Sequence, residues 1–386
     1  MKYLIPAMSL LLIALLGGCA VQKSAARLEA EALYKKGLDI YYYEQPPTEE
    51  GLNFSAQAAE LFGQAIAADS TYAPAYASLA IPIARATGYK GMSSDERNTM
   101  STWAAEKALE LDPDLSMAHV IKGVWQYLGD DGDLEGAEAS FKHAIALDPD
   151  NCEAHREYAL LLQRTGRFEE ALVEAERAYD LDPRSLEVYE TLGNAYRYLG
   201  QYDKAVEMSR KIIKRTPLRS SRYRQLVFTH MMNRKYEEAL KVAREVLEID
   251  PDAAANNRYF GWALVKNGML EEALAAYEKG NGQVGIGRVN ALMGRRDEAL
   301  QVIDDLEQGL EEGQYGTAWN IADIYLGLGE NDLALDWLER SCEMRLQQNQ
   351  FNIAVWGWRL ATEEDYDPLR SDPRFQAVVE KTGYKK

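Results

Sequence analysis

The segment Gly280–Gly285 reads GNGQVG and matches the spacing G-x-G-x-x-G, which holds a pyrophosphate in dinucleotide-binding proteins. That chemistry requires the glycines to follow a β-strand and to open a helix, so that the phosphates meet the helix N-terminus. Here the preceding residues, EEALAAYEKG, have the pattern of a helix. We therefore interpret the segment as a shortened junction between two helices, and we predict no nucleotide cofactor.

The acidic residues and histidines lack the spacing of a metal site or a catalytic site. Asp131 and Asp133 are similar to the start of a calcium-binding loop, but Lys142 stands where calcium needs a bidentate glutamate. The four histidines form no H-E-x-x-H pattern and no Cys–His ligand set. The sequence also has no nucleophile elbow and no phosphate-binding loop. We therefore predict no metal, no cofactor and no enzymatic activity.

Cys19 stands in a context that predicts chemical modification of its thiol. Lys2 is followed by an almost wholly apolar run from Leu4 to Leu16, which is too short to span a bilayer and suits a secretory signal peptide. The run ends in LGGC, which resembles the bacterial lipobox, whose cysteine is diacylated and becomes the mature N-terminus. Because Ala20 and not aspartate follows, the resemblance implies export to the periplasmic side of the outer membrane. The alternative is an ordinary signal peptide with an unrelated cysteine.

The charge balance of the chain restricts its partners. The sequence has 43 Lys and Arg residues against 61 Asp and Glu residues, which gives a net charge of −18. Nucleic acids and anionic lipid surfaces attract basic proteins, so we expect neither as a direct partner. Membrane contact is therefore expected through the N-terminal lipid alone. Solubility of an extended surface is the simpler interpretation of the excess of acidic residues.

The elements that carry these residues are indicated by prolines at a fixed spacing. Each proline closes a similar phrase, and successive members are 34 residues apart: Pro149, Pro183, Pro217 and Pro251. Since proline cannot continue a helix, each marks the turn from one helix pair to the next. Helix pairs that recur with this period resemble the tetratricopeptide repeat (TPR).

The residues between two of these prolines have the spacing of a packed helix pair. Tyr189, Gly193 and Tyr196 fall on one face of the first helix, where Gly193 predicts a close approach of the second helix. Gly200 is expected to end the first helix in a left-handed turn. The same turn position is predicted in other repeats for Gly166, Asn233, Gly268, Gly294 and Gly329.

This register extends in both directions from the prolines. We predict an all-α, right-handed superhelical solenoid of about nine helix pairs between Arg27 and Leu346. In such a solenoid Cys152 and Cys342 lie too far apart for a disulfide, and we interpret both as small core residues.

The C-terminal residues depart from the repeat. The sequence DPLRSDPRF breaks the period, and a last helix is expected to begin near Pro373 and to cover the end of the solenoid. The chain is therefore predicted to comprise a signal peptide (1–18), a lipidated tether (19–26), the TPR array (27–346) and a C-terminal cap (347–386).

A more specific resemblance covers most of the array. Phrases such as YAPAYASLA, EKALELDP and DIYLGLGENDLALDWLERS, followed by DPLRSDPRFQAVV, are similar to one TPR region in particular. That region lies C-terminal to winged-helix, adenylate-cyclase and Ser/Thr-kinase domains in bacterial signalling proteins. The resemblance implies protein–protein interaction or sensing as the role of the array.

Candidate binding residues follow from the TPR resemblance, which implies that one face of each first helix lines a concave groove. The residues at these positions combine arginines, an amide and aromatic rings: Arg156, Asn194, Arg197, Arg224, Phe228, Arg258, Trp262 and Arg288. Arginine grips carboxylates bidentately, and the rings offer stacking surface. We therefore predict a groove that binds an acidic segment of another protein. The alternative is that these arginines pair with neighbouring glutamates such as Glu153, Glu157 and Glu190.

The function predicted from the sequence is that of an envelope TPR lipoprotein that acts as an adaptor or assembly scaffold. An alternative is a ligand-sensing module derived from the signalling array. A third, more remote, hypothesis is an envelope enzyme with a site that the sequence does not reveal.

Overall fold

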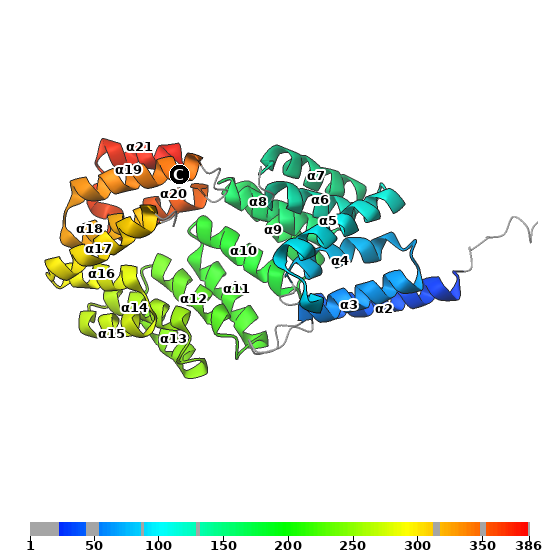
Figure 1. Cartoon of the computed structure of the whole chain (residues 1–386), viewed down its shortest axis with the longest axis horizontal. Helices are drawn as coiled ribbons and strands as arrows, with labels where there is room; N and C mark the ends of the chain where they lie inside the picture. Colours follow the sequence, from blue (N-terminus) through cyan, green and yellow to red (C-terminus); the bar gives the residue numbers. More distant parts are fainter. Residues whose placement is uncertain are drawn as a thin grey trace, which may run out of the picture. The chain divides into compact units, whose positions relative to one another are not determined.

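The computed structural model describes residues 23–43, 54–85, 89–128, 132–311, 317–347 and 353–384. Over these residues the chain is helical throughout and has no β-strand, which confirms the predicted all-α repeat fold (Figure 1). The described helices form nine consecutive pairs followed by a C-terminal segment, as the register predicted. The signal peptide and Cys19 lie outside the described residues.

The chain divides into two compact units, of which the first comprises, among the described residues, 23–41, 55–85 and 89–113. Its helices are α2 (Ala25–Tyr42), α3 (Phe54–Ala68), α4 (Ala73–Arg85), the short η2 (Tyr89–Gly91) and α5 (Ser94–Leu111). In the first pair, the Tyr34 and Phe62 rings lie with centroids 5.9 Å apart. A Cβ atom on Gly37 would lie 2.6 Å from Phe62, so only glycine allows α2 and α3 to pack this closely.

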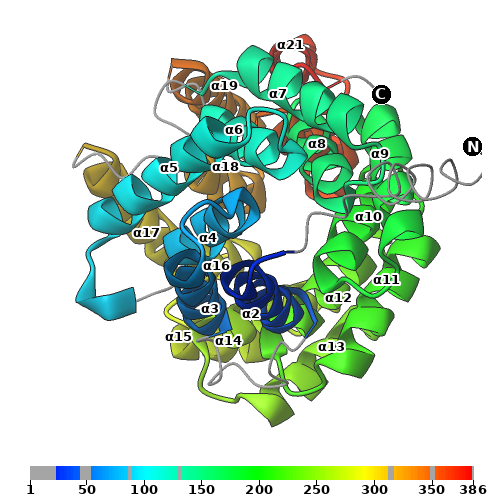
Figure 2. The same cartoon turned by 90° about the vertical axis from the view of Figure 1, so that its right-hand side faces the viewer.

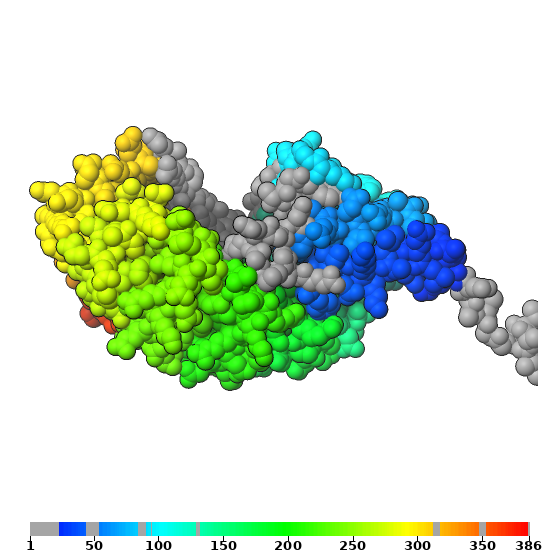
Figure 3. All heavy atoms as spheres, turned by 90° about the horizontal axis from the view of Figure 1, so that it is seen from below, coloured from blue at the N-terminus to red at the C-terminus, as the bar shows by residue number. Residues whose placement is uncertain are grey.

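Over the described residues from 114 onward, the second unit contains seven helix pairs. Their bounds are α6 (Ser116–Leu128), α7 (Leu134–Leu147), α8 (Cys152–Arg164), α9 (Phe168–Leu181), α10 (Leu186–Tyr198), α11 (Tyr202–Arg215), α12 (Ser220–Met232), α13 (Tyr236–Ile249), α14 (Ala254–Lys266), α15 (Leu270–Lys279), α16 (Gln283–Leu292), α17 (Arg296–Glu311), α18 (Thr317–Leu328) and α19 (Asn331–Gln347). Figure 2 shows α9 to α13 following one another around an arc, and Figure 3 shows the succession as a continuous surface that passes from green to yellow.

The turns within the helix pairs follow the predicted chemistry, with one correction. Gly200 has φ +69°, and its N–H donates to the carbonyl of Arg197, which closes the end of α10. In the repeat that lacks a glycine, the left-handed residue is Arg234 (φ +56°) and not Asn233, which has φ −80°. Asparagine tolerates the left-handed region better than arginine does, but the prediction was wrong by one position because Arg234 stands where the other repeats have glycine and its N–H donates to the carbonyl of Met231.

Two cysteines of the described residues are free and lie in different repeats. The Cys152 thiol lies 3.4 Å from the carbonyl of Ala178, and Cys342 is buried on α19. Burial raises the pKa of the Cys152 thiol to about 12, so this thiol has little nucleophilic character at neutral pH. Both positions agree with the interpretation as packing residues.

The C-terminal segment consists of α20 (Ile353–Thr362), η3 (Glu364–Leu369) and α21 (Pro373–Lys381). The last helix begins at Pro373, as predicted, and Asp372 caps it by accepting a hydrogen bond from the Arg374 N–H. Helix α21 packs against α19 and α20, so it covers the end of the last pair.

Helix α20 has a place that the sequence did not predict. It lies beside α8, several repeats earlier in the same unit (Figure 1). Trp358 is only 1% exposed, and its ring centroid lies 5.0 Å from that of Tyr198 and 6.5 Å from that of Phe228. At the start of α20, a Cβ on Gly166 would come within 2.9 Å of Ala354. The C-terminal segment therefore packs against the first helices of earlier repeats.

We predict that Trp358→Ala destabilises the second unit by about 3–5 kcal/mol, because it removes a buried indole from the contact between α20, α10 and α12. Chemical denaturation, with hydrogen exchange of the α20 amides, measures the loss. Trp103→Ala is the control, since Trp103 is 47% exposed and lies in the other unit. Equal effects of the two substitutions would contradict the inferred role of Trp358.

Candidate binding site on the second unit

The predicted groove residues all lie on the first helices of successive pairs. Arg156 is on α8, Asn194 and Arg197 are on α10, Arg224 and Phe228 are on α12, Arg258 and Trp262 are on α14, and Arg288 is on α16. Helix α8 contacts α10, α12 contacts α14 and α14 contacts α16, and side-chain hydrogen bonds and an ion pair join α10 to α12, so these side chains form one row. The structure shows which members of the row are already engaged within the chain.

Arg156 is fully engaged by neighbouring carboxylates. Its Nε and Nη2 donate to the two oxygens of Glu153 at 2.8 and 2.6 Å, and Nη2 also pairs with Glu157. All three side chains are buried, and Tyr127 donates a further hydrogen bond of 3.1 Å to Glu157. At Arg156 the structure shows the internal pairing that the sequence offered as the alternative to ligand binding.

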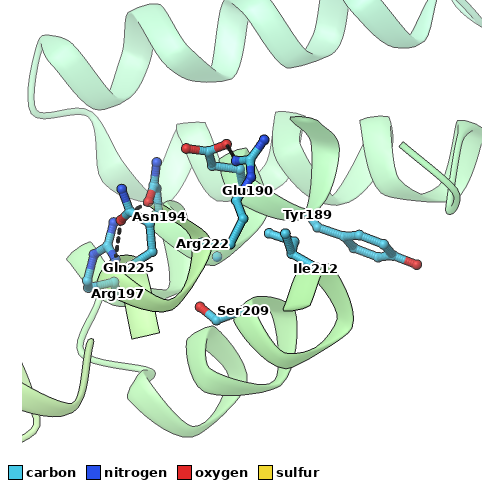
Figure 4. Close-up of a pocket in the computed structure, with 9 residues that line it drawn as sticks. Tyr189, Glu190, Asn194, Arg197, Ser209, Ile212, Arg222 and Gln225 are labelled. Atoms are coloured by element: carbon cyan, nitrogen blue, oxygen red, sulfur yellow. Dashed lines mark hydrogen bonds and ion pairs between the residues drawn. The ribbon is translucent and has the colours of Figure 1, made fainter. Parts of the chain in front are cut away.

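Asn194 and Arg197 belong to a partly buried polar cluster in which Arg197 itself is buried (Figure 4). Arg197 donates to the Asn194 amide oxygen and, through Nη1, to the Thr229 hydroxyl at 3.2 Å, while its guanidinium carbon lies 4.9 Å from the centre of the Phe228 ring. Burial lowers the pKa of Arg197. The adjoining cavity of about 20 Å³ is large enough for one water molecule but not for a peptide side chain.

The neighbouring glutamate in Figure 4 does not neutralise Arg197. Glu190 instead pairs with Arg222 of α12 at 2.5 Å. The sequence alternative named Glu190 as a partner of the groove arginines, and the structure assigns it to an arginine outside the predicted set.

Arg224 and Arg288 also have partners within the chain. Arg224 Nη1 donates to the Asn256 amide oxygen at 2.6 Å and to the Ser220 hydroxyl at 3.3 Å. Arg288 forms an ion pair of 2.6 Å with Asp365 of η3. Burial opposes ionisation of the Asp365 carboxyl, but Arg288 and Lys266 outweigh it and lower its pKa.

The carboxylates that meet the row come largely from the acidic segment Glu363–Asp367, which reads EEDYD. Lys266 of α14 donates to Glu364 at 2.9 Å and to Asp365 at 2.6 Å. Arg359 of α20 pairs at 2.5 Å with Glu363, which follows it by four residues, about one helical turn. The chain's own acidic segment therefore neutralises part of the groove that the sequence predicted to be basic.

One part of the row remains open as a cavity of about 500 Å³, which we call the aromatic pocket. Its walls come from α12, α14, α15, α16, α18 and the C-terminal segment: Phe228, Arg258, Tyr259, Trp262, Tyr277, Asn281, Gly282, Gln283, Val284, Gly285, Arg288, Asp323, Arg359, Glu363 and Asp365. The aromatic pocket contains four of the eight predicted groove residues, namely Phe228, Arg258, Trp262 and Arg288.

Arg258 differs from the other charged residues of the aromatic pocket. It is exposed, and its Nη1 donates to the carbonyl oxygen of Gly280 at 2.9 Å. No carboxylate pairs with it among the residues that the structure describes. Asp323 on the opposite wall accepts a hydrogen bond of 2.7 Å from the Tyr366 hydroxyl, and burial raises the pKa of its carboxyl to about 6 against the effect of Arg288.

The repeat pattern is found independently by comparison with protein families. Tetratricopeptide repeat models match residues 126–185 and 229–286, residues 164–227, and residues 315–348. The chain is a tetratricopeptide repeat protein. A search of curated proteins returned no match.

Solved structures similar to this TPR protein are distant in sequence. Human IFIT1, solved as a dimer with PPP-AAAA, is 17% identical over 82% of this chain and 73% of its own, with a TM-score of 0.50. A TPR protein from Parabacteroides merdae is 15% identical over 69% of this chain and 98% of its own, with a TM-score of 0.48. YrrB, described as a TPR protein with an unusual peptide-binding site, is 18% identical over 52% of this chain and 98% of its own, with a TM-score of 0.38. At these identities the likeness shows the fold alone.

Several residues that line the aromatic pocket of this TPR protein were not predicted from the sequence. The segment Gly280–Gly285 is a junction between α15 and α16, as interpreted, but four of its inner residues and Gly285 also line the aromatic pocket. Tyr259 was missed because it follows Arg258 directly and lies outside the fixed helix positions from which the groove residues were predicted. Arg359 and Glu363 show an i, i+4 charge pair in the sequence, but nothing in the repeat pattern places α20 against α12.

Metal binding finds no support in the part of the TPR chain that the structure describes. No group of three or more His, Cys, Asp or Glu side chains is placed there to hold an ion. His155 is buried, with its Nδ1 2.6 Å from Glu174 and its Nε2 3.1 Å from the carbonyl of Pro149.

The raised pKa of Asp323 predicts a pH effect on stability. Between the unfolded value of 3.8 and the folded value of about 6 the folded state binds more protons at Asp323, so the contribution of this residue to the free energy of unfolding should fall as the pH rises through this window. Asp323→Asn should remove this loss. The gain in free energy of unfolding of the variant over the native chain should therefore be about 1–3 kcal/mol larger at pH 7.5 than at pH 4. Thermal and urea unfolding across this range measures the difference.

The matched control is Asp304→Asn, which changes an exposed aspartate on α17. This variant should keep the pH dependence of the native chain. A pH profile of Asp323→Asn that also matches the native chain would show that Asp323 ionises freely in the folded protein.

Proposed function

We propose that this TPR protein is an adaptor of the bacterial cell envelope that binds a partner protein through the aromatic pocket. The observation that carries the proposal is Arg258, an exposed guanidinium beside aromatic walls, in a cavity on the row of first helices. TPR domains are typically interaction scaffolds, and the repeat family supports this class of function. An acidic partner segment is favoured because arginine binds carboxylates with paired, charge-assisted hydrogen bonds.

The chain's own acidic segment supports the same chemistry. Glu364 and Asp365 are held by Lys266 and Arg288 on the first helices of two repeats. The row therefore accommodates carboxylates at these positions, and Arg258 offers a further position whose charge is not compensated in the described chain. A partner carboxylate at Arg258 would extend an arrangement that the fold already uses.

Membrane attachment is the second part of the proposal. The lipobox-like sequence at Cys19 predicts acylation and anchoring at the periplasmic side of the outer membrane. Among the described helices none is both long and apolar enough to cross a bilayer. A lipid at the N-terminus would hold the array near the membrane and raise the local concentration of its partner there.

A ligand-sensing role is the second candidate, and the size of the aromatic pocket favours it. A volume of about 500 Å³ lies in the range of about 300–1,000 Å³ that is common for small-molecule sites. A sensor would hold a free small molecule in this pocket, whereas an adaptor would hold part of a protein.

Cys19→Ser tests the anchor. The substitution removes the thiol that acylation requires, so the protein should move from the membrane fraction to the soluble periplasmic fraction. Cell fractionation and metabolic labelling with a fatty-acid analogue provide the measurement. Cys152→Ser is the matched control and should leave both results unchanged, while persistence of the Cys19→Ser protein in the membrane would exclude lipid anchoring at this residue.

Arg258→Glu tests the adaptor. A photo-crosslinking amino acid at Gln283, an exposed residue at the rim of the aromatic pocket, should capture a defined protein partner in cells. Charge reversal at Arg258 should reduce the crosslinked product about tenfold or more, because it replaces attraction of a carboxylate by repulsion. Arg244→Glu, which reverses an exposed charge on α13, is the control and should leave the product unchanged. No protein product at Gln283 would count against the adaptor.

A further inference from the structure

The C-terminal segment limits what the row of first helices can hold. Helix α20 lies against α8, and its Trp358 contacts Tyr198 of α10 and Phe228 of α12. Trp358 and Leu360 are at most 1% exposed, so this helix is part of the hydrophobic core of the unit. Helix α20 therefore occupies the space that a long extended peptide would need along α8 and α10. The aromatic pocket lies beside α12 to α18, beyond the part of the row that α20 covers.

The charges that line the aromatic pocket balance one another, with one exception. Arg288 is paired with Asp365 and Arg359 is paired with Glu363, while Asp323 on the opposite wall has the neutral Tyr366 hydroxyl as its hydrogen-bond donor, so the exception concerns the cations. Arg258 alone among these lining residues faces the pocket without a carboxylate partner in the described structure. A ligand that complements the pocket therefore carries one anionic group, placed at the Arg258 guanidinium.

The remaining wall of the pocket suits a ring or a compact apolar group. The Trp262 ring centroid lies 5.9 Å from that of Phe228 and 6.3 Å from that of Tyr259, so the three rings form a continuous surface. Such a surface gains stacking and apolar contact with a ligand ring. The start of α16 at Gly282 lies at the same pocket and adds the partial positive charge of a helix N-terminus.

We infer that the aromatic pocket binds a compact organic acid, a single carboxylate joined to an aromatic or bulky apolar group, with the carboxylate on Arg258 and the apolar group against Trp262. The inference rests on the proposed function, because it specifies the chemistry of the partner at the same site. Two sources have this chemistry. One is the C-terminal residue of a partner protein, and the other is a free aromatic or branched-chain acid. The pocket volume accommodates one such residue with its neighbouring peptide group.

The test compares N-acetyl-L-phenylalanine with its uncharged amide, N-acetyl-L-phenylalaninamide, on the full chain. Saturation-transfer NMR and calorimetry should detect the acid with a dissociation constant on the order of 1 mM, as expected for a ligand of this size. The acid should bind at least about tenfold more tightly than the amide. Arg258→Gln should abolish this preference, and Trp262→Ala should weaken both ligands.

Arg258 is exposed, so Arg258→Gln is expected to fold, and circular dichroism verifies this in each variant. Arg244→Gln is the matched control and should retain the preference for the acid. Equal affinity for acid and amide, retention of the preference in Arg258→Gln, or no binding of either ligand at about 10 mM would overturn the inference.

A short peptide that ends in phenylalanine separates the two sources. Tighter binding of its free-carboxylate form than of N-acetyl-L-phenylalanine assigns the pocket to a protein C-terminus, while exclusion of the peptide assigns it to a free acid. The inference and the proposed function fail differently. A Gln283 crosslink to a protein without binding of the acid leaves the adaptor and rejects the compact acid. Binding of the acid without a crosslinked protein supports the compact acid and counts against the adaptor.

Discussion

The burial of Trp358 between Tyr198 and Phe228 determines much of the candidate site. A helix pair buries one face within itself and another against its neighbours, so an array of pairs leaves its row of first helices available. In this chain α20 returns to that row and covers the part beside α8 and α10. Because the indole is 1% exposed, the contact belongs to the core and its position is fixed by packing. The open part of the row is what remains beyond it.

The same segment also sets the electrostatics of the site. Placing α20 on the array brings Glu363, Glu364 and Asp365 to the cations of α14, α16 and α20. Partly buried cations need opposite charges or hydrogen-bond partners, and the acidic segment supplies them. A row that is basic in sequence thus becomes nearly neutral in the structure. The result is a pocket in which the uncompensated positive charge is located at Arg258.

Residues of similar type in the row have different roles for a related reason. Arg156 and Arg197 are both more than nine-tenths buried, yet Arg156 has two carboxylate partners and Arg197 has only neutral oxygens and the Phe228 ring. Arg258 occupies a comparable helix position but is exposed, and the junction at Gly280 contacts its aliphatic stem and accepts a hydrogen bond from its guanidinium. The position of a residue in the repeat therefore indicates on which helix face its side chain lies. Its local neighbours decide whether the side chain is available to a ligand.

The sequence by itself determined the helical repeat, the turns at Pro149 to Pro251 and the start of the last helix at Pro373, since these depend on local propensity and on a fixed period. It also identified four residues of the aromatic pocket, because side chains at equivalent positions of successive helices share a face. Only the tertiary structure decided the place of α20 and the pairing of Lys266 and Arg288 with the acidic segment. Those contacts join residues roughly 80 to 200 positions apart, and the repeat period has no information about a segment that lies outside it.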